Sequence, residues 1–196
     1  MLLLRNPTDA RIREILAPLA EAPFRHPRVG LTREAISVPP TGYRLDVYGT
    51  TLGEGEAAFE TACTVLRDFG HYPPSFTRVV SLSPGLAAGR VFGTLALHGG
   101  FASLHPCRIV EVIDEAQPRR FGFALGTLPG HVLVGEECFL IELDERSGRV
   151  RYEVRAVSRP DLPIARLGLP IIRLFQARFR RQTCAEMRTR CSQRKV

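Results

Sequence analysis

The sequence contains no tryptophan, and its 27 basic residues include a single lysine, Lys195. No apolar run approaches the roughly 20 residues that a membrane-spanning helix needs. The opening MLLLRN is too short for the apolar core of a signal peptide and has no basic start. The five cysteines are odd in number, widely spaced and without a C-x-x-C pair, which argues against a disulfide framework and against a zinc site. We therefore expect a cytoplasmic protein whose thiols are reduced and buried.

Motifs of the common catalytic and cofactor-binding classes are also missing. No serine lies in a G-x-S-x-G elbow, and the scattered glycines form no phosphate-binding loop. His98 and His105 lie seven residues apart, which matches no zinc or iron pattern. Basic and aromatic residues are not interleaved as in RNA-binding surfaces. We expect no metal and no cofactor.

Positive charge is unevenly distributed along the chain, whose formal net charge is +7. Between Arg166 and Lys195 many arginines are accompanied by one acidic residue, Glu186. Such a run is most often the solvated face of an amphipathic helix. It could also dock on phosphates or on an anionic membrane, so nucleic acid and membrane remain alternative partners.

The first 40 residues predict a helix and a proline-rich arm that precede the main domain. Asn6 is placed to cap the helix, and Pro7 suits its first position. Apolar residues then recur at helical spacing until Pro18, which should bend or end the helix. Residues 23–43 show little periodicity, so we expect an extended arm across the surface of the main domain.

The main domain, which we place at residues 41–191, begins with the alternating strand YRLDVYG. A helix follows within TTLGEGEAAFETACTVLRDFG, where Thr51 and Glu54 have capping-box spacing and Gly70 is a suitable stop. Six further segments have the length and composition of strands, and their short spacings favour antiparallel neighbours. They are FTRVVSL, GRVFGTLAL, CRIVEVIDE, RRFGFALGTL, EECFLIELDE and RVRYEVRAVS. Gly148 should supply the positive φ of the turn between the last two.

The domain ends in a long amphipathic helix from Pro170 onward, in which the apolar residues Ile171, Leu174, Phe175 and Phe179 recur at helical spacing. Residues 192–196 are expected to be a short basic tail. The order strand, helix, six strands, long helix fits an α+β domain with one antiparallel sheet and its helices on one face. A strongly curved sheet around a long helix tends to leave a cavity of the kind that binds small ligands.

Several stretches resemble one uncharacterised family, the domain-of-unknown-function family numbered nineteen-ninety. They are GTLPGHVLVGEECF at residues 126–139, VSRP, LFQARF, TTLGEGEAAFETA and PPTGYRLD, and they cover roughly residues 24–190. This family is similar to the START-like, or SRPBCC, helix-grip superfamily. The resemblance implies a curved seven-stranded antiparallel sheet that grips a long C-terminal helix and encloses an apolar cavity. It also implies ligands such as lipids, sterols or polyketides, and some superfamily members are cyclases or hydrolases, but it supplies no catalytic residue.

Two adjacent glutamates open the strand after the connector PGHVLVG. Side chains alternate along a strand, so Glu137 shares a face with Phe139 and Ile141, whereas Glu136 lies on the other face. The first face is the more apolar, and we expect it to face the long helix. Glu137 should therefore point into the cavity and Glu136 outward.

The same alternation places other side chains around Glu137 at one end of an apolar cavity. A buried carboxylate is costly unless it is paired or protonated, so Glu137 marks a candidate functional site. Alternatively, Glu137 accepts hydrogen bonds from the connector or pairs with an arginine of the long helix, such as Arg173 or Arg178. The candidate ligand-binding residues are Thr127, His131, Glu137, Tyr152, Ser158, Phe123, Phe139 and Phe175.

Three functions fit these features. The first is a binding protein whose helix-grip cavity takes an apolar or amphipathic small molecule. The second is an enzyme, such as a cyclase, hydrolase or isomerase, that uses Glu137 and His131 as an acid–base pair. The third is an interaction protein that docks its basic C-terminal helix on nucleic acid or membrane.

Overall fold

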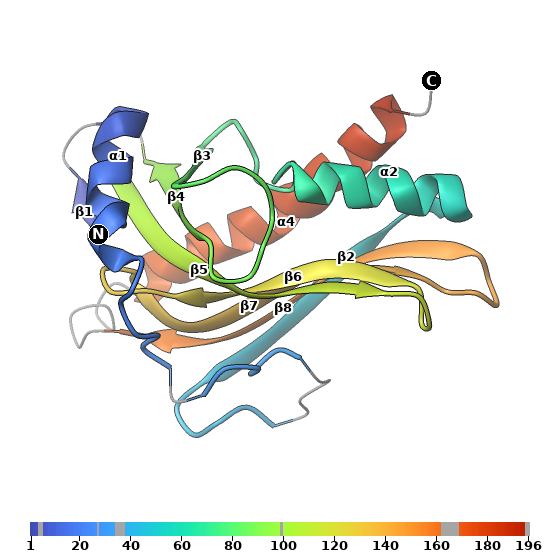
Figure 1. Cartoon of the computed structure of the whole chain (residues 1–196), viewed down its shortest axis with the longest axis horizontal. Helices are drawn as coiled ribbons and strands as arrows, with labels where there is room; N and C mark the ends of the chain where they lie inside the picture. Colours follow the sequence, from blue (N-terminus) through green and yellow to red (C-terminus); the bar gives the residue numbers. More distant parts are fainter. Residues whose placement is uncertain (4–5, 27, 34–37, 99, 162–168, 195–196) are drawn as a thin grey trace.

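A computed structural model of the chain describes residues 1–3, 6–26, 28–33, 38–98, 100–161 and 169–194 (Figure 1). Seven strands form one antiparallel sheet, as the sequence predicts. In spatial order they are β2 (Arg44–Glu54), β8 (Arg149–Pro160), β7 (Leu133–Leu143), β6 (Arg120–Thr127), β5 (Ala102–Glu115), β4 (Val91–Leu97) and β3 (Thr77–Ser81). A two-residue strand, β1 (Leu2–Leu3), also pairs with β5 and lies outside the predicted set.

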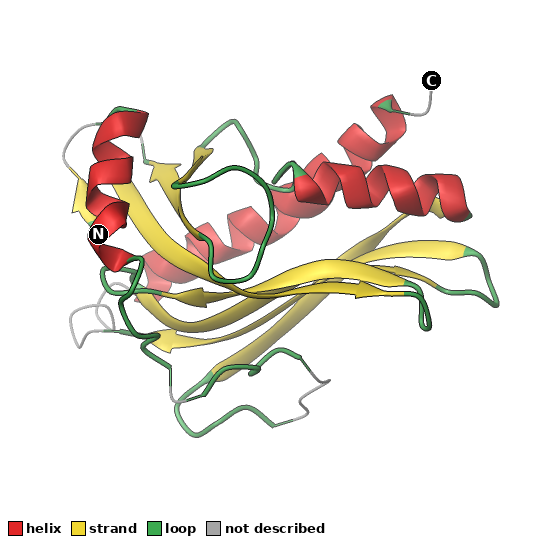
Figure 2. Ribbon diagram, viewed as in Figure 1, coloured by secondary structure: helices red, strands yellow, loops and turns green. Residues whose placement is uncertain are grey.

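Two helices pack on the concave face of this sheet (Figure 2). They are α2 (Glu56–Arg67) and the long α4 (Leu169–Gln193), which runs across the strands and extends past residue 192, where we expected the tail to begin. Their apolar side chains form one core with the inner face of the sheet, including Phe59, Phe123 and Met187. Of the residues predicted for the apolar face of this helix, Leu174 is 65% exposed, and the side chain of Ile171 lies outside the described residues.

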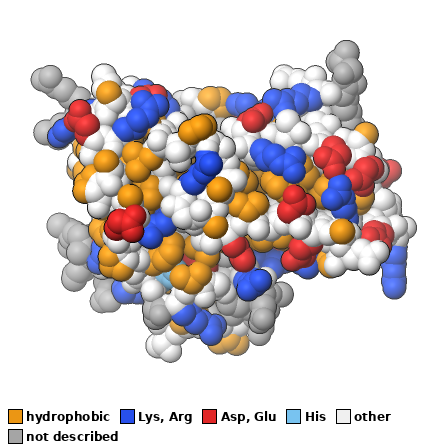
Figure 3. Space-filling model, in the orientation of Figure 1, with side chains coloured by type: hydrophobic (Ala, Val, Ile, Leu, Met, Phe, Trp, Pro, Cys, Tyr) orange, Lys and Arg blue, Asp and Glu red, His pale blue; other side chains and the backbone are white. Residues whose placement is uncertain are grey.

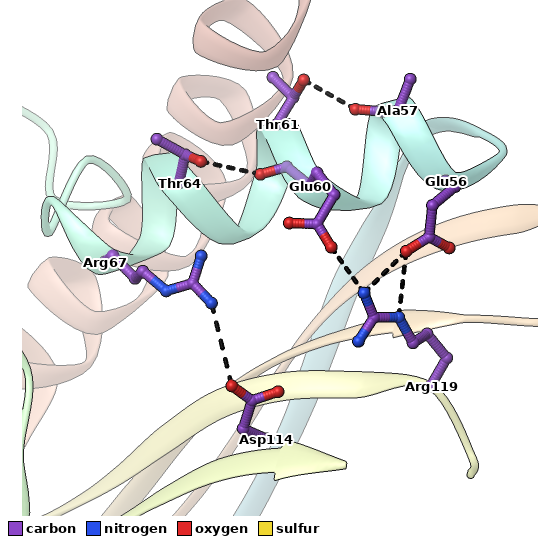
Figure 4. A network of polar contacts seen from close by, with 8 residues as sticks. All are labelled: Glu56, Ala57, Glu60, Thr61, Thr64, Arg67, Asp114 and Arg119. Atoms are coloured by element: carbon purple, nitrogen blue, oxygen red, sulfur yellow. Dashed lines mark hydrogen bonds and ion pairs between the residues drawn. The ribbon is translucent and has the colours of Figure 1, made fainter. Parts of the chain in front are cut away.

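Helix α2 begins at Glu56 with Gly55 at its N-cap, so the predicted capping box at Thr51 and Glu54 is wrong. Both residues instead belong to β2, where they pair with β8, because the sheet ladder satisfies the backbone groups that a cap would serve. The turn before β6 is held to α2 by ion pairs. Arg119 reaches Glu56 and Glu60 with Nη2–Oε1 distances of 2.7 and 2.6 Å (Figure 4).

The N-terminal helix α1 (Asp9–Leu16) is capped by Thr8, whose hydroxyl accepts a hydrogen bond from the Arg11 N–H at 3.3 Å. The predicted cap at Asn6 and start at Pro7 are therefore wrong. As expected, the α-helix stops before Pro18 and continues as the 3-10 turn η1 (Ala17–Leu19). Two fully buried residues of α1, Ile12 and Leu16, pack against β4 and β5 in a second core.

From η1 the chain crosses to the convex face of the sheet, on the side opposite α4 (Figure 1). The Phe24 ring lies against Gly126 of β6, where a Cβ atom would come within 2.6 Å of the ring. Glycine is therefore required for this close approach. The arm thus covers the convex face and not the concave one.

The surface in the view of Figure 3 carries arginine and acidic side chains interspersed among apolar ones. The predicted turn at Gly148 is confirmed, since its φ is 70° and its N–H donates to the Asp144 carbonyl at 2.7 Å. Among the described residues, no helix has both the length and the apolarity to cross a bilayer.

Candidate ligand-binding site

A cavity of about 340 Å³ lies between the concave face of the sheet and α4. That is within the usual range for small-molecule sites. Its wall is mostly apolar, with Leu125 on β6 and Phe175 and Phe179 on α4. Phe101 also lines it and is 42% exposed, so the cavity reaches the surface of the protein beside this ring.

Glu137 faces this cavity from β7, as the alternation predicts. Its side chain is hydrogen-bonded to the hydroxyl of Tyr48, which projects from β2 on the same concave face. Burial raises the pKa of Glu137 to about 7, although the bond from Tyr48 acts in the opposite direction. We call Glu137 and Tyr48 the carboxylate pole of the cavity.

A second carboxylate, Asp46, lies next to the carboxylate pole but forms ion pairs with two arginines. Its Oδ1 is 2.9 Å from Nη1 of Arg180 on α4 and 2.8 Å from Nη2 of Arg44. These two cations therefore compensate the charge of Asp46 and not that of Glu137.

The arginines that we considered as partners of Glu137 do not reach it. Within the described part of the chain, neither Arg173 nor Arg178 makes an ion pair with its carboxylate. Arg178 stacks on the Phe76 ring instead, with its Cζ 4.2 Å from the ring centroid. Glu137 therefore has one protein hydrogen bond and no cationic partner among the described residues.

A chain of imidazoles lies on another part of the cavity wall. The Ser103 hydroxyl is 2.7 Å from Nε2 of His98 and 2.8 Å from Nε2 of His105. The His105 ring meets the His131 ring edge-on, with 4.9 Å between centroids. We call these four residues, His98, Ser103, His105 and His131, the histidine row.

The histidines of this row are held neutral. Burial and, after it, the nearby N-terminal ammonium lower the pKa of His131 to about 3. Burial is also the main cause that lowers the pKa of His105 well below its usual value, followed by the positive charge that His131 would carry. For His98 the pKa is lowered by burial and then by Arg178. Neutral imidazoles each offer one donor and one acceptor, so the histidine row can bind a hydroxyl or carbonyl group.

Polar side chains between these two regions already bond to each other or to the backbone. The Tyr72 hydroxyl is hydrogen-bonded to Thr94, and burial raises its pKa well above the usual value. The Thr127 hydroxyl accepts the Gly135 N–H at 3.0 Å. The middle of the cavity therefore offers a ligand few free hydrogen-bonding groups.

The structure brings together five of the eight candidate ligand-binding residues. Thr127, His131, Glu137, Ser158 and Phe175 line the cavity. The other three, Phe123, Phe139 and Tyr152, do not line it.

These three side chains are fully buried in the core instead. The ring of His71 packs against Phe139 with 4.2 Å between centroids, which separates this part of the sheet from the cavity. Tyr152 directs its hydroxyl to Thr183 of α4, 3.0 Å away. Alternation correctly gave the inward face of β6, β7 and β8, but it does not show where along each strand α2 and α4 fill the space.

Sequence reasoning missed Tyr48, Asp46 and Ser103 as residues of the cavity wall. In β2 the usual pattern is inverted, because Asp46 and Tyr48 face the cavity while Val47 is 52% exposed. Ser103 lies in a stretch that resembles a glycine-rich turn, yet β5 begins at Ala102 and the strand alternation places Ser103 and His105 on one face.

Glu136, the outward glutamate, is 2% exposed because the N-terminal arm covers it. Its carboxylate accepts the backbone N–H groups of Gly30 and Leu31, with shortest N–O distances of 2.7 and 2.9 Å. Burial raises the pKa of Glu136, and these N–H groups oppose the shift. The expectation that it points outward is right for the sheet, but the residue is not in contact with bulk water.

Comparison with models of known families shows which family this chain belongs to. The family model described as "Domain of unknown function (DUF1990)" matches residues 25–186. The chain belongs to this family. The match starts within the arm and ends within α4, so the DUF1990 domain includes the arm that covers Glu136.

Related proteins extend over almost the whole chain. A UPF0548 protein of Deinococcus radiodurans is 31% identical over 188 residues, which cover 91% of this chain and 92% of the relative. A UPF0548 protein of Dictyostelium discoideum is 28% identical over 203 residues and covers 95% and 94%.

Solved structures similar to this DUF1990 chain have the helix-grip fold. The protein TTHA0849 from Thermus thermophilus matches with a TM-score of 0.57 at 10% identity, over 78% of this chain and all of the other. The Zhui aromatase/cyclase from Streptomyces matches with a TM-score of 0.55 at 12% identity, over 79% and 97%. At such low identity these likenesses show the fold alone, which is the one that the sequence resemblance implies.

Proposed function

We propose that this DUF1990 chain binds an amphipathic small molecule in the cavity between the sheet and α4. The observation that carries the proposal is a carboxylate without a cationic partner among the described residues, Glu137, in the wall of a mostly apolar cavity of about 340 Å³. Such a wall favours an apolar body, and an under-bonded polar group within it favours one polar contact.

In this proposal, the apolar part of the ligand packs against Leu125, Phe175 and Phe179. Polar groups of the ligand meet Glu137 and, elsewhere on the wall, His131, and Thr127 and Ser158 are further polar side chains of the lining. Since Asp46 is already paired with Arg180, we expect an anionic head group to be disfavoured at the carboxylate pole.

Filling the cavity tests this proposal. Ala156 lines the cavity and pairs with Glu137 across the sheet, so Ala156→Phe should occupy the space of the ligand. The control is the same substitution at the exposed Ala185 of α4. The wild-type and Ala185→Phe proteins should gain thermal stability from members of a panel of fatty alcohols, sterols and aromatic polyketides, whereas Ala156→Phe should not. The proposal fails if no compound raises the melting temperature of the wild-type protein.

Acid–base catalysis is the second candidate, and the observation that favours it is the position of Glu137 in the wall of the cavity, where burial raises its pKa. A carboxyl group with a pKa of about 7 can both give and take a proton near neutral pH. A role for His131 as its partner has less support, because no contact joins His131 to Glu137 within the described residues and the ring has a pKa of about 3. Substrate turnover that Glu137→Gln abolishes without loss of folding would favour the enzyme over the binding protein.

Docking through the basic helix is not proposed, because much of its charge is used within the molecule. In α4, Arg180 pairs with Asp46 and Arg190 with Glu186, and just after the helix Arg194 pairs with Asp68. A cytoplasmic location stays a prediction that rests on the cysteines, all five of which are buried.

A further inference from the structure

Two groups on the cavity wall keep hydrogen-bonding capacity that the protein does not use. At the carboxylate pole, Tyr48 is the one hydrogen-bond donor to Glu137 among the described residues. In the histidine row, the Ser103 hydroxyl joins two imidazoles through their Nε2 atoms. Nδ1 of His98 is buried without a hydrogen-bond partner among the described residues. A buried polar group without a partner is costly, so each group favours a ligand atom that bonds to it.

The sheet register places these groups far apart. Glu137 pairs with Leu125 on β6, and Leu125 pairs with Ile109 on β5, so these three residues form one row across the strands. His105 lies four residues before Ile109 on β5, and its strand is two strands away from that of Glu137. At about 3.4 Å per residue and about 4.8 Å per strand, the two Cα atoms would lie roughly 17 Å apart on a flat sheet. The curvature of the sheet shortens the distance between the side chains.

The wall between the two groups offers a ligand little hydrogen bonding. Tyr72 and Thr94 bond to each other, and Thr127 is bonded to the Gly135 backbone. Leu125 and Phe179 complete this middle part. A polar group in the middle of a ligand would therefore lose its water without gaining an equivalent bond.

From this arrangement we infer the ligand class, an inference that rests on the proposed function. We propose that the cavity binds an elongated molecule with an apolar middle and a neutral hydrogen-bonding group at each end. One end bonds to Glu137 at the carboxylate pole, and the other bonds to the histidine row. An amphiphile with all its polar groups at one end satisfies only one of the two.

Two isomers of one diol test the inference, because they have the same composition and differ in where the hydroxyl groups lie. In 1,8-octanediol the hydroxyl groups lie at opposite ends, and in 1,2-octanediol they share one end. Calorimetric titration of the wild-type protein should show 1,8-octanediol binding about ten-fold more tightly, the gain expected from one additional satisfied pair.

Variants at each end show which groups produce the preference. His98→Phe removes the imidazole whose Nδ1 lacks a partner among the described residues, and Glu137→Leu removes the carboxylate. Each should reduce the ratio of the two dissociation constants to near one. Thr94→Val is the matched control, because this hydroxyl lies in the cavity wall but is bonded to Tyr72. It should change both affinities alike and leave the ratio as in the wild-type protein.

Equal affinity of the wild-type protein for both isomers overturns the inference and leaves the proposed function intact. A ratio that survives both His98→Phe and Glu137→Leu also overturns it. Failure of both isomers to bind, in a protein that binds members of the wider panel, contradicts the two-ended ligand alone. If nothing in that panel binds either, the proposed function fails with it.

Discussion

Glu136 and Glu137 are neighbours in sequence, yet their carboxylates lie on opposite faces of β7. Glu137 faces the cavity and is bonded to Tyr48, whereas Glu136 accepts the N–H groups of Gly30 and Leu31 in the arm. Two adjacent residues therefore contribute to two different contacts, Glu137 to the wall of the cavity and Glu136 to the binding of the N-terminal arm.

Glu137→Gln should stabilise the ligand-free protein at neutral and alkaline pH. The pKa of Glu137 is raised from 4.5 to about 7, so the folded state binds more protons than the unfolded state between these values. The wild-type protein thus loses stability as pH rises from 4.5 to 7, by up to about 3 kcal/mol. Urea unfolding at about pH 4.5 and about pH 8 should show little gain for the variant at the lower pH and a clear gain at the higher. An equal effect at both values would contradict the raised pKa.

Glu136→Ala should release the arm from the convex face of the sheet. The substitution leaves the Gly30 and Leu31 N–H groups without their acceptor, and we expect a loss of about 3 kcal/mol. Hydrogen exchange should accelerate at these two amides far more than at those of β8. Glu145→Ala, in the exposed turn before β8, is the control and should change neither quantity. Unchanged protection at Gly30 and Leu31 would show that the arm is held by other contacts.

His71→Phe should make the protein less sensitive to acid. The ring is fully buried, neither nitrogen has a partner among the described residues, and burial lowers its pKa to about 3. Between pH 6.5 and 3 the unfolded state therefore binds a proton at His71 that the folded state does not bind. The free energy of unfolding falls as pH falls through this window.

The centroids of the Tyr72 and Phe139 rings lie 4.2 Å from that of His71, so phenylalanine keeps the aromatic contacts, and any cost of its larger ring lowers stability at every pH and leaves the slope unaffected. Below pH 6.5 the slope of the unfolding free energy should decrease by about 1.4 kcal/mol per pH unit relative to the wild-type protein. His105 and His131 contribute in the same direction, so part of the slope remains in the variant. Identical slopes in the two proteins would show that His71 is not responsible.

Tyr152→Phe should destabilise the fold without changing ligand binding. The Tyr152 hydroxyl is 3.0 Å from that of Thr183 inside the core, and its loss leaves a buried hydroxyl unpaired. We expect a cost of about 1–3 kcal/mol in chemical unfolding. Since Tyr152 does not line the cavity, the affinity for a ligand found by thermal shift should stay within about two-fold of wild type. A large loss of affinity would restore Tyr152 to the binding site.

Local patterns gave much of this structure in advance. Periodicity located all seven strands of the main sheet and the two helices of the concave face, because each must present an apolar face to the same core. Strand alternation also placed Glu137 toward the cavity, since the period of two is a property of the backbone itself. The turn at Gly148 followed from the positive φ that this residue adopts.

Signals that depend on competing partners were less reliable. Thr51 and Glu54 have the spacing of a helix cap, but pairing between β2 and β8 uses their backbone groups instead. Asn6 resembles a cap as well, yet Thr8 lies where its hydroxyl reaches the first turn. In both cases the local preference is worth about 1 kcal/mol, and the surrounding contacts outweigh it.

The sequence by itself determined the order of the elements, the inward face of β6, β7 and β8 and the direction of Glu137. Only the tertiary structure decided that the arm buries Glu136, that Tyr48 bonds to Glu137 and that His131 lies beside His105. The physical reason is range. Backbone geometry repeats every two to four residues, so neighbouring residues in the sequence determine it. These contacts join residues that lie between 26 and 106 positions apart, and they form only because the whole sheet curves around α4.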